Sequence, residues 1–83
     1  MIVELQRFID VKDGWFASES KPKELLNFEP MTINTDYIAW VHREDFGPVE
    51  MCVFHMADRG GNFRFDITYK KAVALMRSKR KAA

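Results

Sequence analysis

The feature that most constrains the fold is a change in hydrophobic period near residue 68. Phe63, Phe65 and Ile67 alternate with polar residues, a pattern typical of a half-buried strand. From Thr68 onward the apolar side chains recur at helical spacing, which predicts a basic helix over 68–81. We therefore expect the chain to end in a strand that runs directly into a helix.

The segment before this strand predicts its hairpin partner. Residues 50–57 form an apolar run, and the glycine-rich turn 58–62 separates the run from the alternating segment. Residues 2–11, 31–33 and 37–43 also read as extended. We expect an α+β fold in which a small, curved, mainly antiparallel sheet of four to five strands packs on one C-terminal helix. The predicted core is Phe54, Phe63, Phe65, Ile67, Val73 and Met76.

The segments between these strands carry mixed signals. A bulge near Gln6 and Arg7 would turn both Leu5 and Phe8 inward. Residues 15–17 are compatible with a short strand, and 34–36 predict a turn whose side chains bond their own backbone. Residues 44–49 predict a solvated loop.

The segment 18–30 predicts either an irregular insertion or a short helix. Ser20 is suited to cap the helix, Pro22 to its first turn, and Pro30 to its end. Its buried side would consist of Leu25, Leu26 and Phe28.

Length and composition indicate one domain over residues 1–83. The single cysteine, Cys52, excludes an internal disulfide and fits a reducing compartment. No run approaches the ~20 apolar residues of a membrane span, and the first residues lack the pattern of a signal peptide. We expect a cytoplasmic protein that does not enter membranes.

Charge is distributed unevenly along the chain. Residues 1–67 carry seven Lys and Arg against twelve Asp and Glu, whereas residues 68–83 carry six Lys and Arg and no acidic residue. This asymmetry predicts a basic flank that contacts an anion or a partner. Its candidate residues are Lys70, Lys71, Arg77, Lys79, Arg80 and Lys81.

Three segments resemble the FlbD-like small bacterial proteins. The matching residues are 1–7, 33–38, and the glycine pair 60–61 with 63–76, together about two-thirds of the chain. Residues 12–29 depart from the family as an insertion, and Lys70 and Lys71 stand where the family tends to have acidic residues. The resemblance implies a small β-rich fold and no catalytic residue.

Residue types suited to catalysis or metal binding do not assemble into a motif. His42, His55 and Cys52 are potential ligands, with Glu44 and Asp45 nearby, but no paired metal-ligand spacing occurs. Cys52 and His55 are three residues apart and so face opposite sides of a strand. Gly60 and Gly61 precede a strand rather than a helix, unlike a phosphate-binding loop. We expect no metal, no cofactor and no enzymatic activity.

Two functional hypotheses remain. The strands at 37–41 and 51–57 are apolar on both faces, which predicts a homo-oligomer whose surface includes Tyr37, Ala39, Val41, Met51 and Val53. We favour a non-enzymatic, self-associating interaction or regulatory module of bacterial or phage type, with a protein partner as a further option. The alternative is a nucleic-acid-binding protein that uses the basic helix, with Trp15, Phe16 and Trp40 available for stacking. The near-neutral net charge of +1 favours the first hypothesis.

Overall fold

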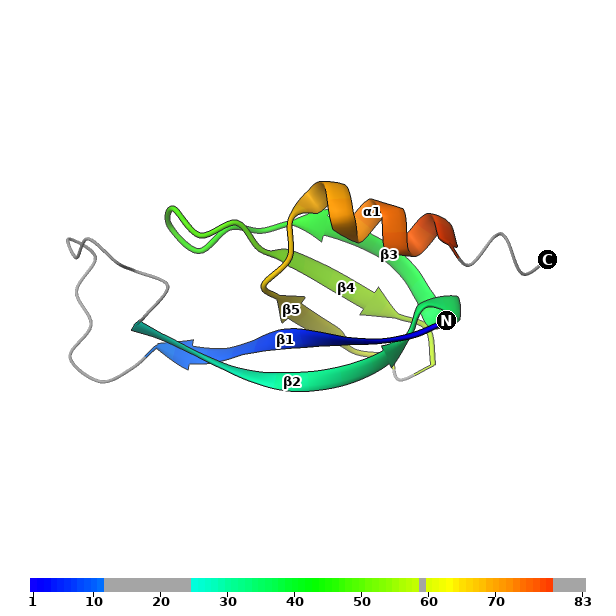
Figure 1. Ribbon diagram of the computed structural model, residues 1–83, viewed down its shortest axis with the longest axis horizontal. Helices are drawn as coiled ribbons and strands as arrows, with labels where there is room; N and C mark the ends of the chain where they lie inside the picture. Colours follow the sequence, from blue (N-terminus) through cyan, green and yellow to red (C-terminus); the bar gives the residue numbers. More distant parts are fainter. Residues whose placement is uncertain (12–24, 59, 79–83) are drawn as a thin grey trace.

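The computed structural model describes residues 1–11, 25–58 and 60–78 and shows a five-stranded antiparallel sheet with one C-terminal helix (Figure 1). The strand order is β2-β1-β5-β4-β3, so β2 and β3 are the edges. This α+β architecture confirms the predicted fold class. The elements are β1 (Ile2–Val11), β2 (Leu26–Asn34), a 3-10 helix η2 (Thr35–Tyr37), β3 (Ile38–Arg43), β4 (Cys52–Met56), β5 (Asn62–Phe65) and α1 (Tyr69–Ser78).

Strand β2 corrects the prediction for the end of the segment 18–30. Residues 26–30 are extended and pair with β1, where a short helix or an irregular insertion was expected. Leu26 is buried and Phe28 packs beside it. These side chains are two residues apart, which is the spacing along one face of a strand and not along one face of a helix. Proline is accommodated because β2 is an edge strand. Residues 15–17 and 18–24 lie outside the described residues.

Pro30 lies opposite Gln6 in the pairing of β2 with β1. The Gln6 carbonyl accepts from the Asp66 N–H at 2.9 Å, on the β5 side of β1. In an antiparallel ladder, a residue whose backbone groups face one neighbour does not bond to the other. The nitrogen of Pro30 therefore faces the free edge of β2.

Strand β1 contains the expected bulge at a different position. The register shifts between Phe8 and Asp10, not near Gln6 and Arg7. The predicted consequence is wrong as well, because no bulge within the described residues of β1 brings Leu5 and Phe8 to one face, although both pack against buried residues. They do so in two different clusters, on opposite faces of the sheet.

The main core lies between the sheet and α1. Ile33 on β2 and Val41 on β3 belong to the same cluster although they come from opposite edges, so the sheet curves around its contents. The buried members are Ile33, Ile38, Val41, Cys52, Phe54, Met56, Phe65, Ile67 and Ala72. Of the predicted core residues, Phe54, Phe65 and Ile67 are buried, whereas Phe63, Val73 and Met76 are partly buried.

A second, smaller cluster corrects the expectation that residues 44–49 form only a solvated loop. Val49 and Met51 are buried with Leu26, and Phe46 packs against them. Phe46 and Val49 pair backbone to backbone across a tight turn in which Gly47 has a φ of 56°. The loop folds back because its two apolar side chains can be covered by β1 and β2.

Helix α1 lies over β3 (Figure 1) and is capped by two side chains. Thr68 Oγ1 accepts from the Lys71 N–H at 3.3 Å, and Glu50 Oε2 accepts from the Tyr69 N–H at 2.9 Å. Ala72 is fully buried, whereas Tyr69 at the start of the helix is 44% exposed.

Residues 79–81 of the predicted helix lie outside the described residues. Within the described part of the chain, no helix has the length and apolar character needed to cross a membrane.

Candidate functional site

Polar and aromatic side chains gather on the face of the sheet opposite α1. Trp40 pairs with His55, and His42 with Val53, across β3 and β4. Val53 in turn pairs with Arg64 on β5. Since side chains alternate along a strand, these residues point away from Val41 and Phe54, which face the main core. We call Trp40, His42, Glu44, His55 and Arg64 the outer-face cluster.

The two histidines are in direct contact. His42 Nδ1 and His55 Nε2 are 3.0 Å apart. The indole ring of Trp40 stacks on the imidazole of His55, with centroids 3.5 Å apart and planes 7° from parallel. Trp40 is nevertheless 52% exposed, so the stack holds His55 in place while leaving much of the indole open to solvent.

Glu44 connects the histidines to Arg64. Its Oε1 lies 3.1 Å from His42 Nε2, and Arg64 Nη2 donates to its Oε2. The hydrogen bond with His42, together with the Arg64 guanidinium, lowers the pKa of Glu44. The Arg64 guanidinium also lies 5.7 Å from the ring centroid of Phe8. The cluster is thus a continuous row from β3 to β1.

Sequence reasoning considered these histidines separately and did not place them together. They are 13 residues apart and occupy different strands. Their contact depends on an irregularity at Ala39, where the register shifts between Ile38 and Trp40. The alternation of Trp40 and His42 was the available signal, because it placed both side chains on one face.

Cys52 does not join the histidines, as its spacing from His55 predicted. Its side chain is fully buried in the main core. Burial raises the pKa of its thiol to about 11. The thiol is therefore protonated at neutral pH and inaccessible, which makes it unsuited to act as a nucleophile. Within residues 1–11, 25–58 and 60–78, no group of three or more His, Cys, Asp and Glu side chains is arranged to hold a metal ion.

Three members of the predicted self-association surface lie inside the chain. Val41, Met51 and Val53 are each less than a tenth exposed. Val41 belongs to the main core and Met51 to the smaller cluster, whereas Val53 is buried on the outer face between its pairing partners His42 and Arg64. Only Tyr37 and Ala39 are exposed. The apolar second face that suggested oligomerisation is thus covered largely by the chain itself.

A different apolar surface is present at the end of the sheet where η2 joins β2 to β3. The Thr35 N–H donates to the Met1 carbonyl at 2.8 Å, which brings the start of β1 to η2. Four exposed apolar residues lie on the segments that begin or end here, which we call the η2 end: Met1 (55%), Ile2 (63%), Tyr37 (47%) and Trp40 (52%).

The basic flank is partly visible. Lys70, Lys71 and Arg77 are exposed on α1, and no ion pair within the described residues involves them. Lys79, Arg80 and Lys81 lie outside the described residues. The observed helix therefore presents three of the six predicted cations to solvent.

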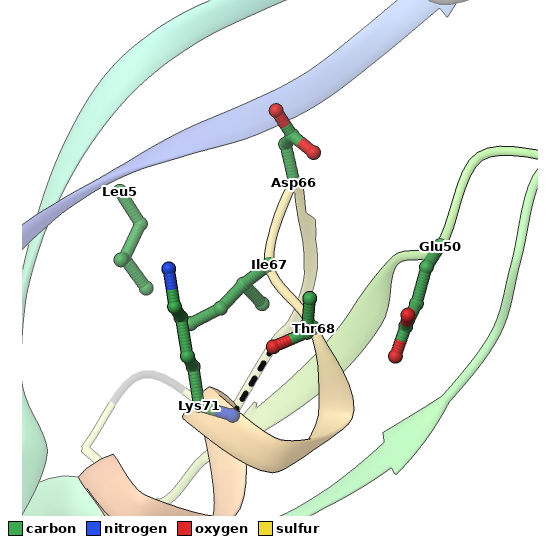
Figure 2. Close-up of a pocket in the computed structure, with 6 residues that line it drawn as sticks. All are labelled: Leu5, Glu50, Asp66, Ile67, Thr68 and Lys71. Atoms are coloured by element: carbon green, nitrogen blue, oxygen red, sulfur yellow. Dashed lines mark hydrogen bonds between the residues drawn. The ribbon is translucent and has the colours of Figure 1, made fainter.

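A pocket of about 350 Å³ lies between β1 and the start of α1 (Figure 2). It is lined by Leu5, Glu50, Asp66, Ile67, Thr68 and Lys71. Lys71 extends along Leu5 on one side, and Glu50 stands on the other. Glu50 and Thr68 are already engaged as caps of the helix, so the polar lining serves the junction between strand and helix.

The FlbD-like resemblance stays a prediction. Comparison with family models, with curated proteins and with solved structures found no match to this chain.

Proposed function

We propose that the protein is a non-enzymatic interaction module that self-associates through the η2 end. The observation that carries this proposal is the exposure of Ile2, Tyr37 and Trp40, each close to half exposed or more, on segments next to η2. Large apolar side chains that gather on a surface are typical of protein interfaces. A small domain gains by burying them against a partner.

A second copy is the partner that this surface suits. The exposed indole of Trp40 has one face stacked on His55, which leaves its other face for an aromatic ring of the other copy. At the η2 end the Met1 ammonium and the Asp36 carboxylate lie 3.9 Å apart and offset each other's charge, which reduces like-charge repulsion between two copies. A two-fold arrangement would place the same residues on both sides of the interface.

Sedimentation equilibrium over a range from micromolar to near-millimolar concentration tests the proposal. We expect dimerisation that weakens at least tenfold when Tyr37→Ser and Trp40→Ala are combined. Tyr69→Ser combined with Ile9→Ser is the matched control, since both side chains are 44% exposed and lie away from the η2 end. A monomer of 9.7 kDa throughout the range would overturn the proposal. So would an equal effect of the two double variants.

A second candidate function is binding of nucleic acid along α1. It is favoured by Lys70, Lys71 and Arg77, which are exposed and form no ion pair within the described residues. Cations along one helix flank attract a phosphate backbone and release its counterions. The remainder of the chain carries an excess of acidic residues, which confines any contact to the helix.

An anisotropy titration with single- and double-stranded probes at low salt distinguishes the two functions. If the helix binds nucleic acid, Lys70→Glu with Arg77→Glu should abolish binding, and the salt slope should fall by about one for each lost phosphate contact. Tyr37→Ser with Trp40→Ala should instead affect only self-association. No binding at ~100 μM would exclude the second function.

A further inference from the structure

We propose that His42 and His55 form a binding site for a divalent transition-metal ion of the Cu²⁺ or Ni²⁺ type. Nδ1 of His42 and Nε2 of His55 come from neighbouring strands and are 3.0 Å apart. Neutral imidazole nitrogens are preferred ligands of these ions. The inference is independent of self-association.

The separation of the nitrogens favours a particular coordination geometry. With metal–nitrogen bonds of about 2.0 Å, two nitrogens 3.0 Å apart subtend an angle of about 95° at the ion. That angle fits neighbouring positions of a square-planar or octahedral complex, which Cu²⁺ and Ni²⁺ adopt. With the same bond length, a tetrahedral zinc site would require the nitrogens to be about 3.3 Å apart.

Glu44 fixes the form of His42 that binding requires. Its Oε1 lies 3.1 Å from His42 Nε2, and its other oxygen accepts from Arg64, so the Glu44 carboxylate acts as the acceptor and His42 Nε2 carries the proton. The lone pair of neutral His42 is then on Nδ1, directed at His55. A carboxylate that holds the outer nitrogen of a ligating histidine is a recurrent feature of metal sites, and it raises the basicity of the ligand.

Binding of the ion at His55 neither releases nor takes up a proton overall. If His42 Nε2 donates to Glu44, Nδ1 of a neutral His42 is an acceptor, and in the metal-free protein the hydrogen of this contact belongs to Nε2 of His55. When the ion binds, the proton on Nε2 is transferred through solvent to Nδ1 of the same ring, and the ring stays neutral. Two water molecules leave the hydrated ion, and the two nitrogens take their places.

The site is open to solvent, and the fluorescence of Trp40 can report binding of the ion. The His42 side chain is 39% exposed, so an ion can enter and retain water in its other positions. Within the described residues the chain supplies no third ligand, which predicts an affinity below that of structural metal sites. Trp40 stacks on His55 at 3.5 Å, and its fluorescence should be quenched by a paramagnetic ion bound there.

The test uses tag-free protein carrying Trp15→Phe, which leaves Trp40 as the only tryptophan. Titration with CuSO₄ or NiCl₂ in a buffer that does not chelate should quench Trp40 and saturate at one ion per chain. The chain has only two histidines, so His42→Ala with His55→Ala removes every imidazole. We expect this double variant to raise the half-saturating concentration at least tenfold, and Zn²⁺ to bind more weakly than Ni²⁺.

Spectra of the bound ion provide the second measurement. Electron paramagnetic resonance of the Cu²⁺ complex should show two equatorial nitrogens with the Trp15→Phe protein. This measurement does not depend on whether the double variant folds. Equal quenching with and without the histidines would overturn the proposal. A Cu²⁺ spectrum lacking nitrogen ligands, or tighter binding of Zn²⁺ than of Ni²⁺, would also overturn it.

Discussion

Among single residues, Glu44 is a carboxylate whose ionised form is stabilised by two neighbouring side chains. One carboxylate oxygen contacts His42 and the other accepts from Arg64, and these contacts lower the pKa of Glu44 below its ordinary value of 4.5. A group whose pKa is lower in the folded state stabilises the fold when it is ionised. This contribution is present above pH 4.5 and is lost as pH falls through the lower folded value.

We therefore expect Glu44→Gln to reduce the pH dependence of stability on the acid side. Urea unfolding at pH 7 and pH 3 should show a smaller difference in free energy for the variant than for the parent protein. Glu4→Gln is a suitable control, because Glu4 is exposed on β1 and forms no ion pair within the described residues. Identical pH profiles for the parent and Glu44→Gln would contradict the role of these contacts.

Among the elements, the hairpin of β4 and β5 depends on one backbone conformation. Gly60 has a φ of 63°, a region that residues with a Cβ rarely adopt. Gly61, its neighbour, has no such constraint, and a Cβ there would meet the Phe63 ring at an ordinary 3.5 Å. The two glycines of this turn therefore have different roles.

Gly60→Ala should lower the free energy of unfolding by about 1 kcal/mol, because the added Cβ strains the left-handed conformation. Gly61→Ala should be close to neutral and serves as the matched control. Denaturant unfolding of both variants measures the difference. A larger loss for Gly61→Ala would show that the turn adopts another conformation.

The same hairpin shows which elements the sequence predicts. The sequence predicted the correct types of secondary structure for residues 50–78, because the change from strand period to helix period is a local signal. The first part of β2, residues 26–30, was missed because Leu25, Leu26 and Phe28 fit a short helix as well as a strand, whereas 31–33 were predicted to be extended. The contact of Trp40 with His55 was not predictable, because the bulge at Ala39 that aligns them has no signature in composition or period.

At the scale of the whole molecule, two clusters of unequal size lie on opposite faces of one sheet. The larger fills the curve of the sheet beneath α1 and includes the fully buried Phe65. The smaller is covered by the loop that contains Val49. Because a domain of this length has little stability in excess, loss of the larger cluster should unfold the whole chain.

We expect Phe65→Ala to cost ~3–5 kcal/mol, enough to leave much of the population unfolded at 25 °C. Phe63→Ala should cost less, because Phe63 is only partly buried. Circular dichroism with urea titration gives both values. Equal losses at the two positions would contradict the burial of Phe65.

Pro30 limits the ability of the β2 edge to pair with a strand of another molecule. Because its nitrogen faces outward and carries no hydrogen, the free edge of β2 cannot supply a regular row of donors to an incoming strand. A fibril that grows by addition of strands needs an unbroken row on every layer. At the β2 edge, the native fold is therefore a poor template for amyloid growth.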